Sequence, residues 1–139
     1  MIISYKMKKV SKIILINPKN KLLLLYLRDN NPSISYPGYW DFIGGEVEKG
    51  ENFLEAVKRE IKEEINCKVE EIQFLSEYMY LPLDIHFNFF KGKIEQPIEN
   101  IKLTEGQKLR YFNLSDLPNI RLPPFFRDFI YKNQDRIFF

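Results

Sequence analysis

Two stretches near the N-terminus are dense in branched apolar residues and are bounded by turn-forming residues. The first, Lys9 to Asn17, reads KVSKIILIN, and the second, Lys21 to Arg28, reads KLLLLYLR. The segment between them, NPKN, is typical of a turn. Runs of this length between turn signals are short for helices, so the pattern predicts two strands joined as an antiparallel hairpin.

The clearest helical periodicity lies between Asn52 and Ile65. At about 100° per residue the apolar side chains of this segment share one arc, while Lys58, Lys62 and Glu55 fall on the solvent side. Asn66 follows, and asparagine tolerates the left-handed conformation that ends many helices. The pattern therefore predicts an amphipathic helix with one buried face. The residues predicted to be buried are Phe53, Leu54, Val57, Ile61 and Ile65.

The remainder of the chain alternates between strand-sized apolar runs and polar connections. A loop is predicted at Asp29–Gly38, a short strand at Tyr39–Ile43 and a polar connection at Lys93–Gln107. Further strands are predicted at Ile72–Tyr80, Ile85–Lys91 and Leu109–Phe112, and a second helix at Pro123–Asn133. The order of strands, helix, strands and helix predicts one α+β domain over residues 1–139, with helices packed on a mixed sheet.

Composition narrows the chemistry. The net charge is +2, from 21 basic and 19 acidic residues, which gives no global case for binding duplex nucleic acid. Cys67 is the one cysteine and His86 the one histidine, so neither a disulfide within the chain nor a Cys/His zinc site is possible. No apolar run approaches the roughly 18 residues of a membrane span, and we expect a cytoplasmic protein. Any bound metal would be held by oxygen ligands, as Mg²⁺, Mn²⁺ and Ca²⁺ are.

Three carboxylates gather on the predicted helix. Glu60, Glu63 and Glu64 stand at i, i+3 and i+4 and share one narrow arc beside the apolar stripe. Like charges at this spacing cost about 0.2–0.5 kcal/mol per pair on an open surface. Arg59 lies one turn before Glu63 and could pair with it, whereas Glu60 and Glu64 have no basic residue three or four positions away. The cluster is either a solvated acidic face or a site for a divalent cation.

The residues around the carboxylates resemble a known motif. The segment from Gly45 to Cys67 reads GEVEKGENFLEAVKREIKEEINC. It resembles the Nudix box, which is Gly, five residues, Glu, seven residues, Arg-Glu, an aliphatic, any residue, Glu-Glu, any residue, Gly and an aliphatic. Every charged position matches, while Asn66 replaces the second Gly and Cys67 the last aliphatic. The preceding segment, PGYWDFIGG, resembles the entry segment of the family, with Ile43 in place of a proline.

This resemblance implies a fold, a reaction and a metal site. The fold would be a Nudix α/β/α sandwich with a mixed β-sheet. The reaction would be Mg²⁺- or Mn²⁺-dependent attack of water on a phosphorus of a nucleoside diphosphate linked to a group X, and a (d)NTP is the expected small nucleotide. The metal ligands would be the Gly45 carbonyl, Glu60, Glu63 and Glu64, and the structural pair would be Glu51 and Arg59.

Other roles stay open at the level of sequence. The general base would be Glu60 or Glu105, which is otherwise an exposed loop residue. Arg28 would contact the substrate phosphate or be a surface arginine at a strand end. Trp40 could stack on a base or lie in the core. Phe126 replaces an Asn that reads the oxidised purine in one family member, and it could stack on a ring or pack in the core.

Two rival functions remain. A non-catalytic Nudix module would bind a nucleotide as a sensor, although such modules typically lose box carboxylates that are all present here. A Nudix-fold isomerase of isoprenoid diphosphates would use a cysteine outside the box, whereas Cys67 lies inside it. Many family members form dimers, so a homodimer is a further possibility. The sequence does not name X.

Overall fold

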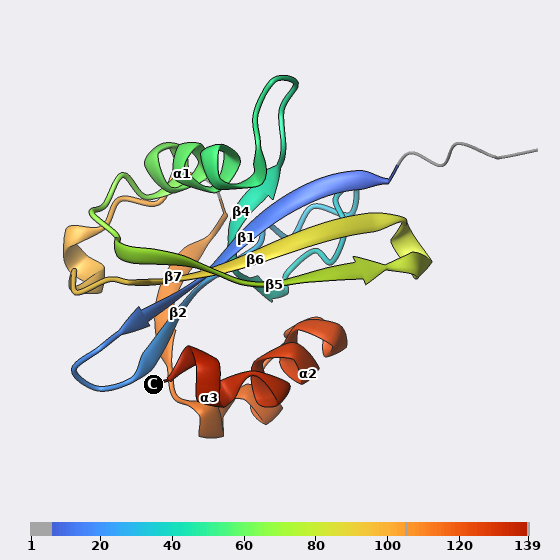
Figure 1. Cartoon of the computed structure of the whole chain (residues 1–139). Helices are drawn as coiled ribbons and strands as arrows, with labels where there is room; N and C mark the ends of the chain where they lie inside the picture. Colours follow the sequence, from blue (N-terminus) through green and yellow to red (C-terminus); the bar gives the residue numbers. More distant parts are fainter. Residues whose placement is uncertain (1–6, 105, 139) are drawn as a thin grey trace, which may run out of the picture.

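One mixed β-sheet of seven strands organises residues 7–104 and 106–138, the part of the chain that the computed structural model describes (Figure 1). The strands are β1 (Lys8–Asn17), β2 (Leu22–Leu27), β3 (Trp40–Asp41), β4 (Ile43–Glu46), β5 (Glu70–Tyr80), β6 (Ile85–Lys93) and β7 (Lys108–Phe112). β1 and β6 run parallel, and the other strand pairs are antiparallel. The predicted mixed sheet is therefore confirmed.

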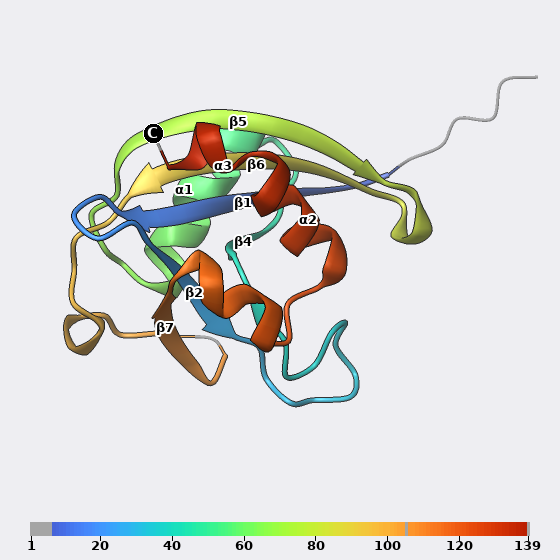
Figure 2. The same ribbon diagram turned by 90° about the horizontal axis from the view of Figure 1, so that it is seen from below.

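Helices cover both faces of this sheet. One face carries α1 (Phe53–Glu64), and the opposite face carries α2 (Pro124–Lys132) and α3 (Gln134–Ile137) (Figures 1 and 2). Three short 3₁₀ turns, η1 (Leu81–Leu83), η2 (Ile98–Asn100) and η3 (Leu114–Asn119), lie in the connections. The arrangement is the predicted α/β/α sandwich. None of the helices in the described residues is both long and apolar enough to cross a membrane.

The first two strands, β1 and β2, pair with each other only close to the turn that joins them. β1 pairs with β2 only from Leu15 to Asn17, whereas its earlier half, from Val10 to Ile13, pairs with β4. The far end of β2 pairs with β3 instead. The hairpin predicted from sequence is thus closed only near its turn. The segment 40–46 inserts between the two strands, which brings its glycines into the middle of the molecule.

β1 is buried on both of its faces. Val10, Ile14 and Ile16 belong to the core beneath α2, while Ile13 and Leu15 belong to the core beneath α1. This two-sided burial explains why the strand reads as an almost continuous apolar run rather than as an alternating one. Such a strand leaves little room for a charged side chain.

Local signals fix both ends of α1. The Asn52 side chain accepts a hydrogen bond from the Glu55 backbone N–H at 2.8 Å. In turn, the Glu55 carboxylate accepts one from the Asn52 backbone N–H at 3.0 Å. This capping box satisfies two N–H groups that a helix start leaves unpaired. After the helix, Asn66 has a φ of +46°, the left-handed conformation expected for it. Both boundaries are therefore encoded within a few residues.

The buried face of α1 differs from the predicted one at Leu54, Ala56 and Glu64, since Ala56 is fully buried although it was not predicted to be. Leu54 was expected in the core but is 39% exposed, because it lies at the edge of the apolar arc in the first turn. Glu64, in contrast, is only 3% exposed, although it is charged. The face that α1 turns toward the sheet thus carries a carboxylate as well as Val57 and Ile61.

Gly44 has a backbone conformation and surroundings that exclude any side chain. Its φ is +146°, and a Cβ atom there would lie 2.1 Å from the Ser11 carbonyl oxygen. We expect Gly44→Ala to lower the free energy of unfolding by about 3 kcal/mol or more, because strain and overlap add. Gly50→Ala is the control, since Gly50 also has a positive φ but no atom would come within 4 Å of its Cβ.

The control variant should lose only about 1–2 kcal/mol, the cost of a left-handed conformation. Urea denaturation of both variants measures the difference. Equal losses would show that the approach of β1 to Gly44 is not what requires a glycine there.

Candidate active site

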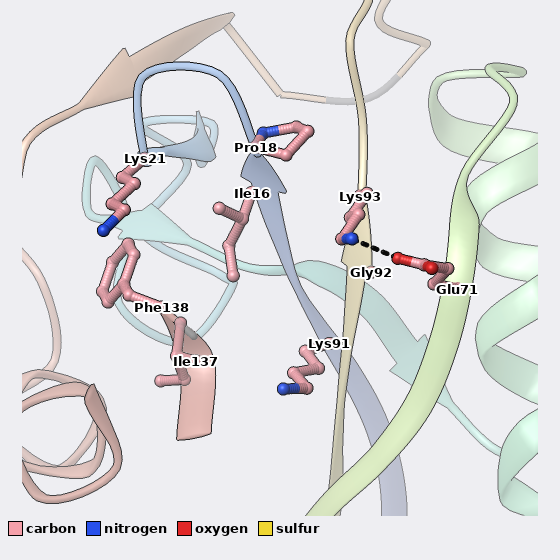
Figure 3. A pocket seen from close by; sticks show the side chains of 9 residues that line it. All are labelled: Ile16, Pro18, Lys21, Glu71, Lys91, Gly92, Lys93, Ile137 and Phe138. Atoms are coloured by element: carbon pink, nitrogen blue, oxygen red, sulfur yellow. Dashed lines mark ion pairs between the residues drawn. The ribbon is translucent and has the colours of Figure 1, made fainter. Parts of the chain in front are cut away.

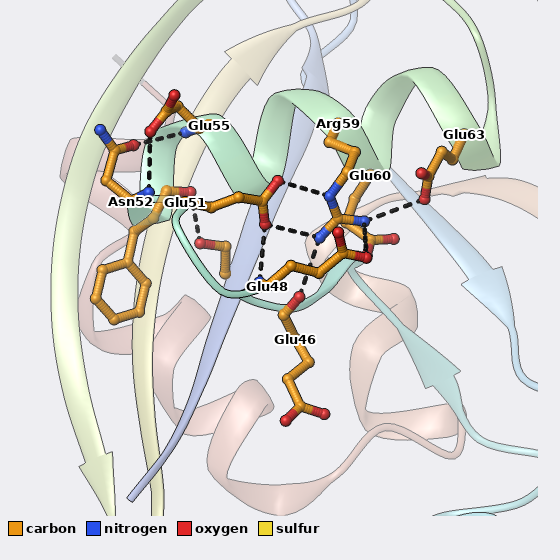
Figure 4. A network of polar contacts seen from close by, with 10 residues as sticks. Glu46, Glu48, Glu51, Asn52, Glu55, Arg59, Glu60 and Glu63 are labelled. Atoms are coloured by element: carbon orange, nitrogen blue, oxygen red, sulfur yellow. Dashed lines mark hydrogen bonds and ion pairs between the residues drawn. The ribbon is translucent and has the colours of Figure 1, made fainter.

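Arg59 is the centre of a polar network that joins α1 to the loop after β4 (Figure 4). Its Nε donates to Oε2 of Glu51 at 2.7 Å, and its Nη2 donates to Oε1 of the same carboxylate at 3.0 Å. Nη2 also donates to the Glu46 carbonyl at 3.1 Å. Nη1 donates to Glu60 at 2.9 Å and to Glu63 at 3.1 Å. One guanidinium therefore fixes the loop and two of the clustered carboxylates.

These contacts shift the pKa values of both partners in the central pair. Hydrogen bonds to Glu51 are the main reason that the pKa of Arg59 is raised. The pKa of Glu51 is lowered, first by the hydrogen bonds from Arg59 and then by the Glu48 backbone N–H, 2.9 Å from Oε1. The structural pair implied by the resemblance is thus present. Arg59 also pairs with Glu60, a partner that spacing of three or four residues did not suggest.

The backbone of Gly44 and Gly45 lies directly against the carboxylates of α1. The Gly44 N–H donates to Oε2 of buried Glu64 at 3.2 Å. A Cβ atom on Gly45 would lie 2.6 Å from Oε1 of Glu60. Of these two glycines, Gly44 is the one with a positive φ. A side chain on Gly45 would require the Glu60 carboxylate, which Arg59 holds, to move.

The oxygen donors at this place suit a hard cation. Glu60 and Glu64 meet the Gly44–Gly45 backbone from one side, and carboxylate and carbonyl oxygens are the ligands that Mg²⁺ prefers. Glu63 stands at the rim, its side chain 58% exposed, and turns toward Arg59. Within residues 7–104 and 106–138, no three acidic, histidine or cysteine side chains already form a metal-binding group. The four-ligand set therefore stays a prediction.

A cavity of about 220 Å³ opens beside Gly45 on the α2 side of the sheet. Strands β1, β4 and β6, the loop between β2 and β3, and the start of α2 all contribute to its wall. The wall combines charged groups with aromatic rings. Its main members are Lys8, Lys12, Arg28 and Asp41, with Tyr36 and Phe125. Such a mixture suits a ligand that has both a flat ring and negative charge.

Arg28 lies in this wall, as its proposed contact with substrate phosphate requires. Its Nη1 donates to Oδ2 of Asp41 at 3.0 Å, and its Nε donates to the Ser35 carbonyl at 2.9 Å. Asp41 is 4% exposed and also pairs with Lys12 at 3.1 Å. Sequence reasoning missed both Lys12 and Asp41. The signal for Lys12 was available, because it is the one charge inside the apolar run from Val10 to Ile16.

Tyr26 lies between this charged cluster and the α1 carboxylates. Burial is the main cause of its raised pKa, and the charges of Asp41 and Glu64 raise it further. Its hydroxyl donates to Oδ2 of Asp41 at 3.4 Å. The cavity wall and the carboxylate cluster are therefore electrostatically continuous.

Three other predicted site residues have different outcomes. Trp40 is 8% exposed, its ring lies edge-on 4.7 Å from Phe112, and it does not line the cavity. The structure thus places Trp40 in the core, which is one of the two alternatives left open by the sequence, and not among the residues around the cavity. Phe126 is 3% exposed and packs 4.7 Å from Phe42, yet it also lines the cavity. Glu105 lies outside the described residues.

His86 and Cys67 are accounted for by packing and pairing. His86 lies 2.9 Å from Glu77 through Nε2 and edge-on to Phe53. Cys67 packs against the α1-side core, and burial raises the pKa of its thiol. The described contacts of both residues are therefore structural ones.

A second cavity, of about 250 Å³, lies at the other end of β1 (Figure 3). Its wall is apolar where it is formed by Ile16, Ile137 and Phe138. Three lysines also line the cavity, namely Lys21, Lys91 and Lys93. Lys93 pairs with Glu71 there. No residue of the Gly45–Cys67 motif lines this cavity, whereas Gly45 and Glu46 line the other one, so the candidate active site is the one beside Gly45.

Comparison with known proteins agrees with this geometry. The sequence model of the NUDIX domain matches residues 7–132, so the chain belongs to the Nudix family. An 8-oxo-dGTP diphosphatase of Buchnera aphidicola subsp. Schizaphis graminum is 28% identical over 126 residues, covering 87% of this chain and 89% of that protein. The chain is thus a MutT-like Nudix hydrolase, a pyrophosphohydrolase.

Solved structures give the same result for the fold. A MutT structure from a study of Aliivibrio salmonicida and Vibrio cholerae has a TM-score of 0.72 and 25% identity, covering 91% of this chain and 96% of that one. A MutT protein from Methanosarcina mazei Go1 has a TM-score of 0.76 and 22% identity, with coverage of 97% and 98%. The NUDIX domain of Shewanella oneidensis NrtR, solved with ADP ribose, has a TM-score of 0.76 at 15% identity, with coverage of 94% and 88%.

The Glu51–Arg59 pair should make stability depend on pH in the acid range. The pKa of Glu51 is lowered on folding, so its contribution is fully present above the ordinary value of 4.5 and is lost as the pH falls through the lower folded value. We expect Glu51→Gln to be less stable than the parent at pH 7 and to lose less stability on acidification. Urea midpoints at pH 7 and at steps down to pH 3 measure both effects.

Glu95→Gln is the control, because Glu95 is an exposed carboxylate away from the network. It should keep the acid slope of the parent. A Glu51→Gln protein with an unchanged slope would show that the pair contributes nothing to the acid sensitivity.

Proposed function

We propose that this hydrolase converts a nucleoside triphosphate, with Mg²⁺ or Mn²⁺, into the nucleoside monophosphate and pyrophosphate. One observation carries the proposal. Gly45 lines a cavity whose wall contains aromatic and positively charged side chains, and Gly45 also lies against the carboxylate of Glu60. A nucleotide with its ring in the cavity would extend its phosphates toward the carboxylate cluster. The name of the 28%-identical relative supports the same substrate class.

The residues proposed to hold the metal are the Gly45 carbonyl, Glu60, Glu63 and Glu64. When bound, the cation would neutralise charge on the pyrophosphate and increase the acidity of a water molecule. The chain itself supplies the arrangement of these ligands. Arg59 holds Glu60 and Glu63, and the Gly44 N–H holds Glu64, so little side-chain entropy remains to be lost on binding.

In the proposed reaction, the oxygen of water forms a bond to one phosphorus of the pyrophosphate linkage. The bond from that phosphorus to the bridging oxygen breaks, and the bridging oxygen leaves with the other phosphate. A carboxylate accepts the proton of the water, and the candidates are Glu60, Glu64 and Glu105. Arg28 would hold a substrate phosphate oxygen, because its Nη2 has no partner within residues 7–104 and 106–138.

The nucleobase of the substrate would lie against aromatic side chains, because residue 126 offers no hydrogen-bonding group. Phe126 offers only its ring to the cavity, and Phe125 stacks on Tyr80 at 4.2 Å close by. Ser35 and Tyr36 are the uncharged polar residues in the wall. Rings and hydroxyl groups would accept an oxidised or an ordinary purine, so the comparison between these nucleotides is the informative one.

The substrate class is tested by a hydrolysis panel with each metal. The panel contains ordinary (d)NTPs, 8-oxo-dGTP, ADP-ribose, nucleotide sugars and dinucleoside polyphosphates. We expect a triphosphate to give monophosphate and pyrophosphate by chromatography, and a chelator to stop the reaction. Faster cleavage of ADP-ribose or a nucleotide sugar than of every triphosphate would overturn the proposal.

Glu64→Gln tests the role of the carboxylate cluster. We expect turnover to fall about 100- to 1000-fold, because a charge that holds the cation at the reacting phosphate is lost. Folding should survive, since a glutamine oxygen can still accept the Gly44 N–H and like-charge repulsion is relieved. The measurement is kcat on the best substrate of the panel, alongside the urea midpoint.

Glu99→Gln, at an exposed carboxylate in η2, is the matched control and should keep normal turnover. Near-normal turnover of Glu64→Gln would remove Glu64 from the metal-binding set.

A further inference from the structure

We propose that Lys12 is a substrate-binding residue whose ammonium group contacts the phosphate next to the nucleoside. This inference rests on the proposed function, because it takes the cavity beside Gly45 to hold a nucleotide. It goes beyond the box motif, because Lys12 lies on β1, well before Gly45, the first residue of that motif.

Lys12 is a charged side chain at the heart of an apolar strand. It is 6% exposed, and its neighbours on β1 belong to the two cores. Its Nζ donates to Oδ2 of Asp41 at 3.1 Å and to the Phe42 carbonyl at 3.4 Å. A lysine has three N–H donors. Within the described part of the chain the third has no acceptor, and Lys12 lines the cavity.

The carboxylate of Asp41 has two cationic partners, Lys12 and Arg28, although one would balance its charge. Its Oδ1 accepts the Phe42 backbone N–H at 2.7 Å, and its Oδ2 receives Lys12, Arg28 and the Tyr26 hydroxyl. Arg28 alone would balance the charge of the carboxylate. Two cations on one carboxylate leave one positive charge in the wall of the cavity, and a buried excess charge is costly unless a ligand meets it. The cluster is therefore complementary to an anion.

The position of Lys12 selects which anion. A Cβ atom on Gly44 would lie 3.0 Å from Cδ of Lys12, and the Gly44 N–H is bound to Glu64. Lys12 thus stands between the aromatic part of the cavity and the carboxylates of α1. A nucleotide that spans these two regions has its first phosphate at this place. Asp41 acts as the positioning residue that holds the ammonium there.

The test is binding of a nucleoside and of its monophosphate to the whole chain without metal. Calorimetry with deoxyguanosine and with dGMP, in the presence of a chelator, separates contact with the phosphate from contact with the ring. We expect Lys12→Met to bind dGMP about 10- to 100-fold more weakly, the range for one charge-assisted hydrogen bond. Its affinity for deoxyguanosine should stay unchanged. Lys12→Arg should recover most of the affinity for dGMP.

Lys9→Met is the matched control. It removes the same charge from the same strand, but Lys9 is exposed and does not line the cavity. It should bind both ligands as the parent does. If Lys12→Met does not fold, Lys12→Gln takes its place, since it keeps a hydrogen bond to Asp41 without the charge.

The outcomes separate this inference from the function on which it rests. Equal dGMP affinity in Lys12→Met and Lys9→Met would overturn the role of Lys12. Equal losses for dGMP and deoxyguanosine would also overturn it, because they would show a structural effect on the cavity. A parent protein that cleaves no triphosphate, while dGMP binding still depends on Lys12, would reject the proposed function and support the phosphate contact.

Discussion

The bidentate ion pair between Arg59 and Glu51 is the contact on which the rest of the site depends. It joins a loop residue to a helix residue eight positions later, with Nε–Oε2 at 2.7 Å and Nη2–Oε1 at 3.0 Å. The same guanidinium then reaches Glu60 and Glu63. Because one rigid group makes all these contacts, the loop, the helix and two carboxylates can move only together. The hydrogen bonds of this pair are also the main reason that the pKa of Glu51 is lowered.

A second constraint places this assembly against the sheet. β1 and β2 separate after the pairs from Leu15 to Asn17, and the segment 40–46 enters the opening. Its two glycines then lie where side chains would overlap, Gly44 with Ser11 and Gly45 with Glu60. The separation of two strands therefore explains both the missing side chains and the approach of α1. It also brings Asp41 against Lys12 and Arg28, which come from different strands.

The predictions from sequence succeeded where the information is local. The limits of α1 follow from a capping box and from Asn66, all within a few residues of the helix ends. The resemblance to the Nudix box likewise implied the Glu51–Arg59 pair, whose two members lie eight residues apart within the motif. What the sequence left wrong or open involves distant partners: the exposure of Leu54 and the choice between two roles for Trp40 both depend on what another element places nearby. Lys12 was visible as a charge in an apolar run, but its partner Asp41 is 29 residues away.

The two sides of the sheet carry clusters of opposite charge. α1 concentrates carboxylates on one side, whereas Lys12 and Arg28 add positive charge at the cavity on the other. Under the proposed function, the carboxylates alone would repel the phosphates of a metal-bound nucleotide, and the cations alone would repel its metal. The segment 40–46 touches both groups, through Asp41 on one and through Gly44 and Gly45 on the other. Under the proposed function, a short strand whose glycines carry no side chains would let opposite charges meet the same ligand without first pairing with each other.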